Sequence, residues 1–378
     1  MAADTGPGTG NNRKPIRVLI VDDSAYMRFT LGKALSAHPG LEVVGAARDG
    51  QEALELIPKL QPDVVTLDVE MPRLDGLSTL RQIMAQWPRP VIMLSSLTTE
   101  GARETILALT WGAVDFVAKP ATKANVAAIM DEVITKIQAA AQARIRARPQ
   151  PLTPPPLSPQ YRASAWFGGG MTEGRGEGKS TRPLRMRDRV VVIGASTGGP
   201  GALHMVIPGL PADLPAAVLI VQHMPVGFTR SLAERLDSVS ALAIKEAAPG
   251  DALEVGRALL APGGFHMTVD ENGRIALNQN PAVHGVRPAV DVTMTSVAQR
   301  YGASTIGVVL TGMGRDGTNG ALLIRSAGGQ VIAEDESTCV VWGMPRSVVE
   351  AGAADKVVPL PEVAAAIEAA VRGRNRGV

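Results

Sequence analysis

The sequence of 378 residues contains a single cysteine and no long apolar run. One thiol, Cys339, cannot form an internal disulfide, so nothing in the sequence points to an oxidising compartment. No apolar run approaches the ~20 residues that span a bilayer, and the N-terminal MAADTGPGTGNNRKP lacks the apolar centre of a signal peptide. These absences predict a cytoplasmic protein without membrane insertion, in which Cys339 is a small buried strand residue.

Charge of one sign is not in excess either. The 38 Lys and Arg residues nearly balance the 36 Asp and Glu residues, and the net charge is +2. So small a charge does not by itself imply nucleic-acid binding, and the second half of the chain has no helix-turn-helix pattern. Hydrophobic residues make up 45% of the sequence and charged residues 20%, ordinary values for a soluble α/β protein.

One segment has the composition of a linker. Clustered prolines in PQPLTPPPLSP (149–159) are followed by clustered glycines in FGGGMTEGRGEGKSTRP. Such a segment cannot bury enough apolar surface to offset the entropy of ordering it. The predicted organisation is a flexible tail over 1–15, a first domain over 16–135, a linker over 136–187 and a second domain over 188–372.

Apolar runs alternate with helix-like stretches on both sides of this segment. Before it lie RVLIV (17–21), LEVVGAA (41–47), DVVTL (63–67), PVIML (90–94) and VDFVA (114–118); after it lie VVVIG, PAAVLIVQ, STIGVVL and GGQVIA. This alternation predicts an α/β fold with two parallel, doubly wound sheets covered by helices on both faces. In such sheets the working residues lie at the carboxyl ends of the strands.

Polar side chains follow four of the five predicted strands in the first half. Asp22 and Asp23 follow the first strand, Asp68 ends the third, Ser95 ends the fourth, and Lys119 follows the fifth. In a sheet of order 2-1-3-4-5 these side chains converge at one edge. Carboxylates at close range repel one another, and a hard divalent cation such as Mg²⁺ relieves the repulsion. A lysine opposite them can hold a developing phosphoryl oxygen.

The motifs VDDSAYMR, TLDVEMPRLDG, VIMLSSLT and DFVAKP resemble those of the response-regulator receiver domain, over about 16–135. The resemblance implies a flavodoxin-like fold in which Asp68 accepts a phosphoryl group from a histidine kinase. It further implies that Asp22, Asp23 and Asp68 hold Mg²⁺, together with the backbone carbonyl of Glu70.

Three more residues take roles from the same resemblance. It implies that Ser95 and Lys119 sense the phosphoryl group and that Phe116 is the switch aromatic. Many receivers precede DNA-binding domains, so the first half alone leaves the output of the protein open.

The second half begins with VVVIGASTGGPGAL, a strand that runs into a glycine-rich turn. The turn fails as a dinucleotide fingerprint because Ser196 stands where glycine is required, and it fails as a P-loop because no Lys-Ser or Lys-Thr pair follows. Gly194 to Gly198 does satisfy G-x-S-x-G, the sharp turn that exposes a serine hydroxyl. A helix N-terminus behind it directs backbone N–H groups at developing negative charge.

A serine nucleophile needs a base. The chain has five histidines: His38, His204, His223, His266 and His284. His38 belongs to the first half, and His204 lies on the helix after the turn. His223 ends the strand next to that of Ser196, which favours it as the base, although spacing does not exclude His266 or His284.

The histidine in turn needs a carboxylate. Asp316, in the glycine-rich loop LTGMGRDG after another buried strand, is preferred over its rival Asp291, which precedes a helix in RPAVDV. The resulting order, Ser196, His223, Asp316, differs from the Ser-Asp-His order of α/β-hydrolases.

The second half resembles the catalytic domain of the chemotaxis protein-glutamate methylesterases over about 188–372. The matching motifs are IGASTGGP, VQHMPVGFTRSLAERL, APGGFHM, RPAVDV, LTGMGRDG and CVVWGMPR. The resemblance implies a Rossmann-like domain that hydrolyses glutamyl methyl esters on the cytoplasmic region of chemoreceptors, releases methanol and deamidates receptor glutamines. Ser196 is then the nucleophile, with the amides of Met313 and of the turn near Thr197 as oxyanion donors. No cofactor is implied for the hydrolysis.

Two classes of function follow from these patterns. The first is a hydrolase; its resemblance to the methylesterase family implies that the unphosphorylated receiver covers the active site. The alternative is a phosphorylation-controlled module that binds a nucleotide or a protein without catalysis. GASTGG supports the alternative weakly, and His223 in place of a ribose-binding acid speaks against it.

Overall fold

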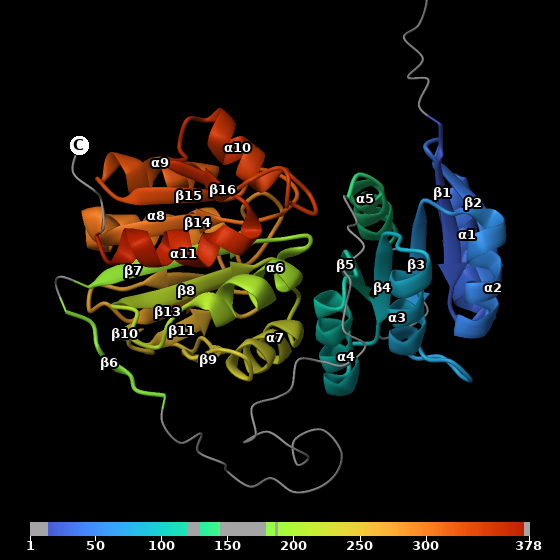
Figure 1. The fold of residues 1–378 in the computed structure, drawn as a ribbon, viewed down its shortest axis with the longest axis horizontal. Coiled ribbons are helices and arrows are strands. Elements are labelled where there is room, and N and C mark those ends of the chain that lie inside the picture. Colours follow the sequence, from blue (N-terminus) through green and yellow to red (C-terminus); the bar gives the residue numbers. More distant parts are fainter. Residues whose placement is uncertain (1–13, 120–128, 144–178, 186–187, 374–378) are drawn as a thin grey trace, which may run out of the picture.

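The computed structural model describes residues 14–119, 129–143, 179–185 and 188–373 (Figure 1). Most of the predicted tail and the proline- and glycine-rich part of the predicted linker lie outside these residues. Two parallel sheets, each covered by helices, make up the described chain. None of the described helices has the length and apolar character needed to cross a bilayer.

The first sheet has the strand order β2-β1-β3-β4-β5, and all of its pairings are parallel, which confirms the predicted fold. Its strands are β1 (Ile16–Val21), β2 (Leu41–Ala47), β3 (Val64–Asp68), β4 (Val91–Ser95) and β5 (Asp115–Ala118). Its helices are α1 (Ala25–Ser36), α2 (Gly50–Leu60), α3 (Gly76–Gln86), α4 (Thr99–Thr110) and α5 (Met130–Ala141). Buried residues of α1 and α5 pack on one face, and those of α2, α3 and α4 on the other.

The second sheet contains seven parallel strands among the described residues, in the order β16-β15-β14-β7-β8-β11-β9. The strands are β7 (Arg189–Ala195), β8 (Ala216–Gln222), β9 (Ala243–Glu246), β11 (Arg257–Leu260), β14 (Thr305–Val309), β15 (Gln330–Glu334) and β16 (Lys356–Val358). Two short antiparallel pairs accompany it: β6 (Arg182–Pro183) with β10 (Glu254–Val255), and β12 (His266–Val269) with β13 (Ile275–Asn278).

Helices cover both faces of this second sheet, as the alternation predicts. They are α6 (Gly199–Val206), α7 (Phe228–Asp237), α8 (Val290–Tyr301), α9 (Thr318–Ser326), α10 (Met344–Glu350) and α11 (Leu360–Val371). Successive residues of β7 point to opposite faces: Val191 and Ile193 join the core under α6, α7 and α11, whereas Val190 and Val192 join the core under α8, α9 and α10.

Ordered structure extends into both ends of the segment predicted as a linker. Helix α5 runs to Ala141 because Val133, Ile137 and Ala140 bury the same face of the helix against the first sheet. At the other end, Arg182 forms an ion pair with the buried carboxylate of Asp188 and thereby fixes β6.

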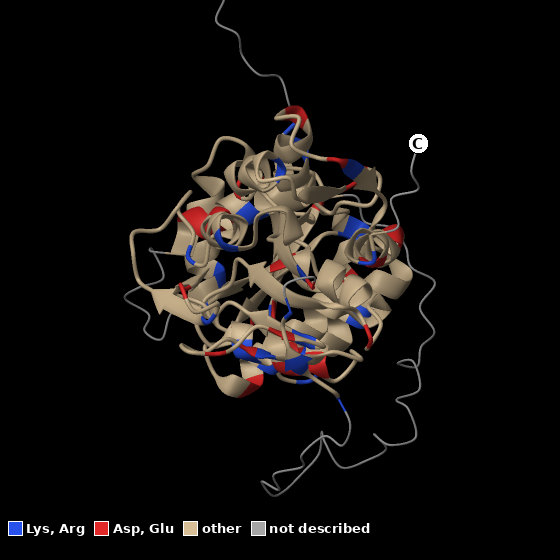
Figure 2. Ribbon diagram, turned by 90° about the vertical axis from the view of Figure 1, so that its left-hand side faces the viewer, with Lys and Arg blue, Asp and Glu red and all other residues tan. Residues whose placement is uncertain are grey.

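The two sheet domains share one continuous apolar cluster. Helix α4 packs against α6 and α7, so the α4–β5 side of the first domain faces the second (Figure 1). The Phe116 and Phe228 rings meet there with centroids 4.4 Å apart. Seen from the second domain, basic and acidic residues are interspersed over the ribbon, in keeping with the small net charge (Figure 2).

Candidate phosphorylation and hydrolase sites

An acidic pocket lies at the carboxyl edge of the first sheet. Asp22, Asp23 and Asp68 each contribute one carboxylate oxygen, and these three atoms all lie within 4.8 Å of one another. The Lys119 Nζ lies 2.8 Å from Asp22 Oδ2 and 2.6 Å from Asp68 Oδ2. The structure therefore brings together the three acids and the lysine that the sequence places at these strand ends.

The electrostatics of the pocket suit a hard cation. Burial raises the pKa of Asp68 to about 7; Lys119 opposes this rise and the charge of Asp22 adds to it. Burial works to lower the pKa of Lys119, but the Asp68 and Asp22 charges outweigh it and the pKa is raised. Three clustered carboxylates with a single lysine leave excess negative charge, which fits the all-oxygen ligand sets that Mg²⁺ prefers.

Three more residues have predicted roles in phosphorylation: Glu70, Ser95 and Phe116. Each of them has a different environment. The Glu70 amide, two residues along the chain, donates to Asp68 Oδ1 at 3.3 Å, so the Glu70 backbone lies against the predicted phosphoryl acceptor. The Ser95 hydroxyl is buried and donates to the Gly101 carbonyl at 3.0 Å, so in this structure it is directed at α4. Phe116 is buried in the contact between the domains.

The second sheet presents Ser196 on a sharp turn between β7 and α6. Gly198 has φ of 79°, and a Cβ on it would lie 2.6 Å from the Cβ of Val340, so the turn requires glycine there. The Ser196 amide donates to the Thr311 carbonyl at 3.0 Å. The turn is thus fixed from the loop after β14, and Ser196 remains partly exposed.

His223 lies beside this turn, on the neighbouring strand. Ala195 and Gln222 are partners in the pairing of β7 with β8, and the next residues are Ser196 and His223. The His223 amide donates to the Ala195 carbonyl at 3.2 Å. No hydrogen bond joins the Ser196 hydroxyl to the His223 ring among the described residues, and catalytic bonds of this kind often tighten only when substrate binds.

Asp316 holds the other side of the imidazole. Its Oδ2 lies 2.8 Å from His223 Nε2. Backbone amides of Val290, Asp291 and Gly317 donate to the same carboxylate at 2.7 to 2.9 Å. Two of these donors are the first amides of α8, so a helix N-terminus fixes the carboxylate. With Nε2 committed to Asp316, Nδ1 is the nitrogen left to act on the serine.

The charge of Asp316 is stabilised where it lies. Burial works to raise its pKa, but the hydrogen bond and charge of His223, together with the amides of Asp291 and Val290, outweigh it, and the pKa is lowered. Asp316 is therefore ionised at neutral pH, as a group that orients an imidazole must be.

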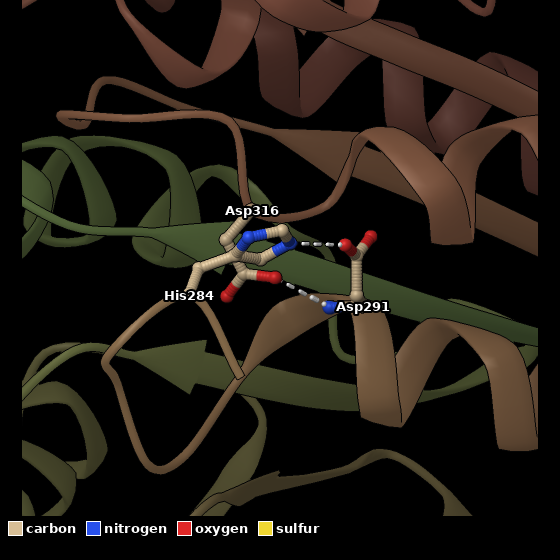
Figure 3. Close-up of side chains that lie close together, drawn as sticks. All are labelled: His284, Asp291 and Asp316. Atoms are coloured by element: carbon tan, nitrogen blue, oxygen red, sulfur yellow. Dashed lines mark hydrogen bonds and ion pairs between the residues drawn. The ribbon is translucent and has the colours of Figure 1, made fainter. Parts of the chain in front are cut away.

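The rival residues are engaged elsewhere. His266 is buried, with Nε2 3.1 Å from the Pro281 carbonyl. His284 Nε2 pairs with Asp291 Oδ2 at 3.0 Å, while the Asp291 amide supports Asp316 (Figure 3). These contacts favour His223 and Asp316 over their rivals.

The two predicted oxyanion donors lie on loops at the same sheet edge. Met313 is 46% exposed, and the preceding carbonyl, of Gly312, accepts from the amides of Gly343 and Met344 at 3.0 and 2.8 Å. In the described part of the chain, neither the Thr197 amide nor the Met313 amide donates to a backbone carbonyl.

The first domain contacts the serine turn itself. The Val114 carbonyl accepts from the Gly198 amide at 3.0 Å, and Asp115 Oδ2 accepts from the Thr197 hydroxyl at 2.6 Å. Sequence reasoning assigned no role to Asp115, because a contact between two domains leaves no periodic signal in either. It also assigned no role to Gln222, whose Nε2 donates to the Ser196 carbonyl at 2.9 Å. The position of Gln222 at the strand end, directly before His223, could have pointed to this contact.

Comparisons with known proteins agree with this architecture. The CheB methylesterase family model matches residues 191–367, and the response regulator receiver domain model matches residues 18–131. A protein-glutamate methylesterase/protein-glutamine glutaminase of Symbiobacterium thermophilum is 56% identical over 95% of this chain and 98% of its own length. The protein of the same name in Pyrococcus abyssi is 47% identical over 95% and 94% of the two chains.

Among solved structures, the catalytic domain of the Thermotoga maritima CheB methylesterase is 49% identical, covering 48% of this chain and 97% of that one with a TM-score of 0.47. The agreement in sequence extends over both domains. The chain therefore belongs to the family of protein-glutamate methylesterases/protein-glutamine glutaminases, in which a response-regulator receiver domain precedes the methylesterase domain.

Proposed function

We propose that this protein hydrolyses glutamyl methyl esters on the cytoplasmic region of chemoreceptors, releases methanol, and also deamidates receptor glutamines. The observation that carries the proposal is the imidazole of His223, held at 2.8 Å by the ionised Asp316 at the strand end next to Ser196. The protein is then a cytoplasmic enzyme of chemotaxis adaptation, with methylated receptors as substrates.

The proposed chemistry is acyl transfer through the serine. His223 Nδ1 takes the hydroxyl proton as Ser196 Oγ attacks the ester carbonyl carbon, and the oxyanion lies against the amides of Thr197 and Met313. The proton passes from His223 to the methoxy oxygen as the bond to methanol breaks. Water, deprotonated by His223, then hydrolyses the acyl-enzyme, which restores the serine and leaves a glutamate.

The receiver domain is proposed to control this reaction. A histidine kinase phosphorylates Asp68, and Asp22 and Asp23 with the carbonyl of Glu70 hold the Mg²⁺ that phosphorylation requires. Bound Mg²⁺ neutralises the carboxylates and the oxygens of the phosphodonor. Lys119, whose Nζ lies 2.6 Å from Asp68 Oδ2, would pair with the phosphoryl group. Ser95 must exchange its bond to Gly101 for one to that group.

Without phosphorylation, the receiver restrains the serine turn. Val114 and Asp115 accept the Gly198 amide and the Thr197 hydroxyl, and Phe116 stacks on Phe228 one residue further along β5. A change at the Asp68 end of the sheet that moves Phe116 therefore acts on all three contacts. Shifting such an equilibrium from 1:99 to 99:1 requires about 5.5 kcal/mol of differential stability.

A methanol-release assay on methylated receptor fragments, with and without a small phosphodonor, tests the proposal. We expect release by the wild-type protein and a clear increase with the phosphodonor. Asp68→Asn is expected to retain basal release and to lose the increase, because the amide cannot accept a phosphoryl group. Asp131→Asn, which changes an exposed acid on α5, is the matched control and should respond as the wild type. Stimulation that persists in Asp68→Asn contradicts the assigned acceptor.

Removing the receiver's hydrogen bond to the serine turn is expected to raise the unstimulated rate. Asp115→Ala deletes the acceptor of the Thr197 hydroxyl, and a hydrogen bond to a charged group is worth about 1.5–3 kcal/mol. We expect methanol release without phosphodonor to rise by at least about tenfold, which corresponds to the lower end of this energy range.

Asp115 also pairs with Lys136 at 3.3 Å. Glu132→Ala, which removes the other carboxylate of Lys136, at 2.8 Å, and does not touch Thr197, is therefore the control. Equal unstimulated rates in wild type, Asp115→Ala and Glu132→Ala contradict restraint through this bond.

A further inference from the structure

A buried carboxyl group outside the proposed machinery lies at the carboxyl end of β15. Glu334 has no exposed surface, and none of the ion pairs among the described residues involves it. Its Oε1 is buried without a hydrogen-bond partner in the described part of the chain. Burying a carboxyl group costs stability unless its contacts compensate for it.

One contact of Glu334 is with Thr311, in the loop after β14 that supports the serine turn. The Thr311 amide donates to Glu334 Oε2 at 2.8 Å. The Thr311 carbonyl accepts from the Ser196 amide at 3.0 Å, and its hydroxyl donates to the Thr197 carbonyl at 3.0 Å. Thr311 thus connects Glu334 to the residues proposed as nucleophile and oxyanion donor.

The same threonine fixes the second oxyanion loop. The Val341 amide donates to the Thr311 hydroxyl at 2.9 Å, and the Gly312 amide donates to the Val341 carbonyl at 3.0 Å. Met313 follows directly. One buried network, in which Glu334 takes part through Oε2, therefore links the two loops whose amides would face the oxyanion.

Glu334 serves this network in either protonation state. Burial raises its pKa to about 7; the Thr311 amide and, to a smaller extent, the side chains of Thr338 and Cys339 oppose the rise, and the charge of Asp335 adds to it. A carboxylate and a carboxylic acid can both accept a hydrogen bond from the Thr311 amide. Burial also raises the pKa of the nearby Cys339 thiol. The useful property of the side chain is its acceptor oxygen.

We propose that Glu334 is a positioning residue for the hydrolysis: through Thr311, its carboxyl oxygen holds the Ser196–Thr197 turn and the Gly312–Met313 loop at the spacing the reaction needs. The inference rests on the proposed function, because it assigns Glu334 to the same reaction.

Two substitutions of Glu334 distinguish a role as hydrogen-bond acceptor from a role in packing alone. Glu334→Gln keeps an oxygen that can accept the Thr311 amide, whereas Glu334→Leu removes it. We expect Gln to stay within about threefold of the wild-type kcat, and Leu to lose tenfold or more, towards the ~10²-fold loss that a 1 Å misplacement causes. KM should change little, and the rate at which a serine-directed organophosphate labels Ser196 should fall in parallel with kcat.

Val331→Ala, in the same strand and also buried, is the control for lost packing alone. It should lower the melting temperature and leave kcat near the wild-type value. If Glu334→Leu does not fold, Thr311→Val replaces it, because that variant removes one hydroxyl from the same network and should also lower kcat.

Equal kcat in the wild type and Glu334→Leu, or a fully active Thr311→Val, overturns the positioning role. So does a Glu334→Gln variant as slow as Glu334→Leu, because the acceptor oxygen would then not be what matters. Failure of the proposed function looks different: the wild-type protein itself would release no methanol and would not be labelled at Ser196.

Discussion

Ser196→Ala is expected to stop ester hydrolysis, with kcat lower by roughly 10⁶-fold, the size of loss that removal of a triad serine produces. The reason is that the attacking oxygen is lost while the rest of the site stays in place. The Ser196 amide and carbonyl, which bond to Thr311 and Gln222, belong to the backbone and are retained by alanine. The binding of a methylated receptor fragment should therefore change little.

Methanol release and receptor binding are measured side by side for this variant. Ser326→Ala, at an exposed position on α9, controls for the loss of a serine hydroxyl. Residual activity of Ser196→Ala within tenfold of the wild type contradicts the assignment of the nucleophile, and a matched loss of binding would mean that the substitution disrupted the site rather than the chemistry.

Asp316→Asn is expected to lower kcat by about 10⁴-fold, as the corresponding change does in serine proteases. The carboxylate accepts from His223 Nε2 and leaves Nδ1 free of a proton to receive that of the serine. An amide can instead donate to Nε2, which moves the proton to Nδ1 and removes the base. It also removes the negative charge that stabilises the imidazolium.

Asp291→Asn is the matched comparison. Its side chain pairs with His284, while its support of Asp316 comes from the backbone amide, which asparagine keeps. We therefore expect kcat to fall by no more than about tenfold, because asparagine can replace most of the hydrogen bonds of the carboxylate. If Asp291→Asn were the slower of the two, the rival carboxylate would be the orienting group.

The architecture could be predicted where strands are long and buried. The runs that became β1, β3, β4, β7, β8 and β14 are almost wholly apolar, as strands covered on both faces must be. The strands β9, β11 and β16 were missed because AIKE, RALL and KVV are three or four residues long and carry charged side chains. They occupy the edge regions of the sheet, where one-sided exposure weakens the apolar signal.

The same contrast applies to the sites. That Asp68 and His223 lie at the carboxyl edges of the sheets could be predicted, because the topology of a parallel sheet brings those strand ends together. Spacing alone favours Asp316 over Asp291, and the coordinates add that the first amides of α8 donate to Asp316, one of them from Asp291 itself. Asp115 and Glu334 could not be found from sequence, because their contacts depend on how domains dock and on which buried oxygen reaches an amide.

Labelling with a serine-directed organophosphate, followed by mass-spectrometric mapping of the modified peptide, examines the activated hydroxyl itself. We expect a single adduct, on the serine of GASTGG, which forms faster when a small phosphodonor and Mg²⁺ are present than when they are absent. A protein that takes up no label under either condition, or takes it up at another residue, is not the phosphorylation-controlled serine hydrolase described above, and a non-catalytic binding module would then be the better account.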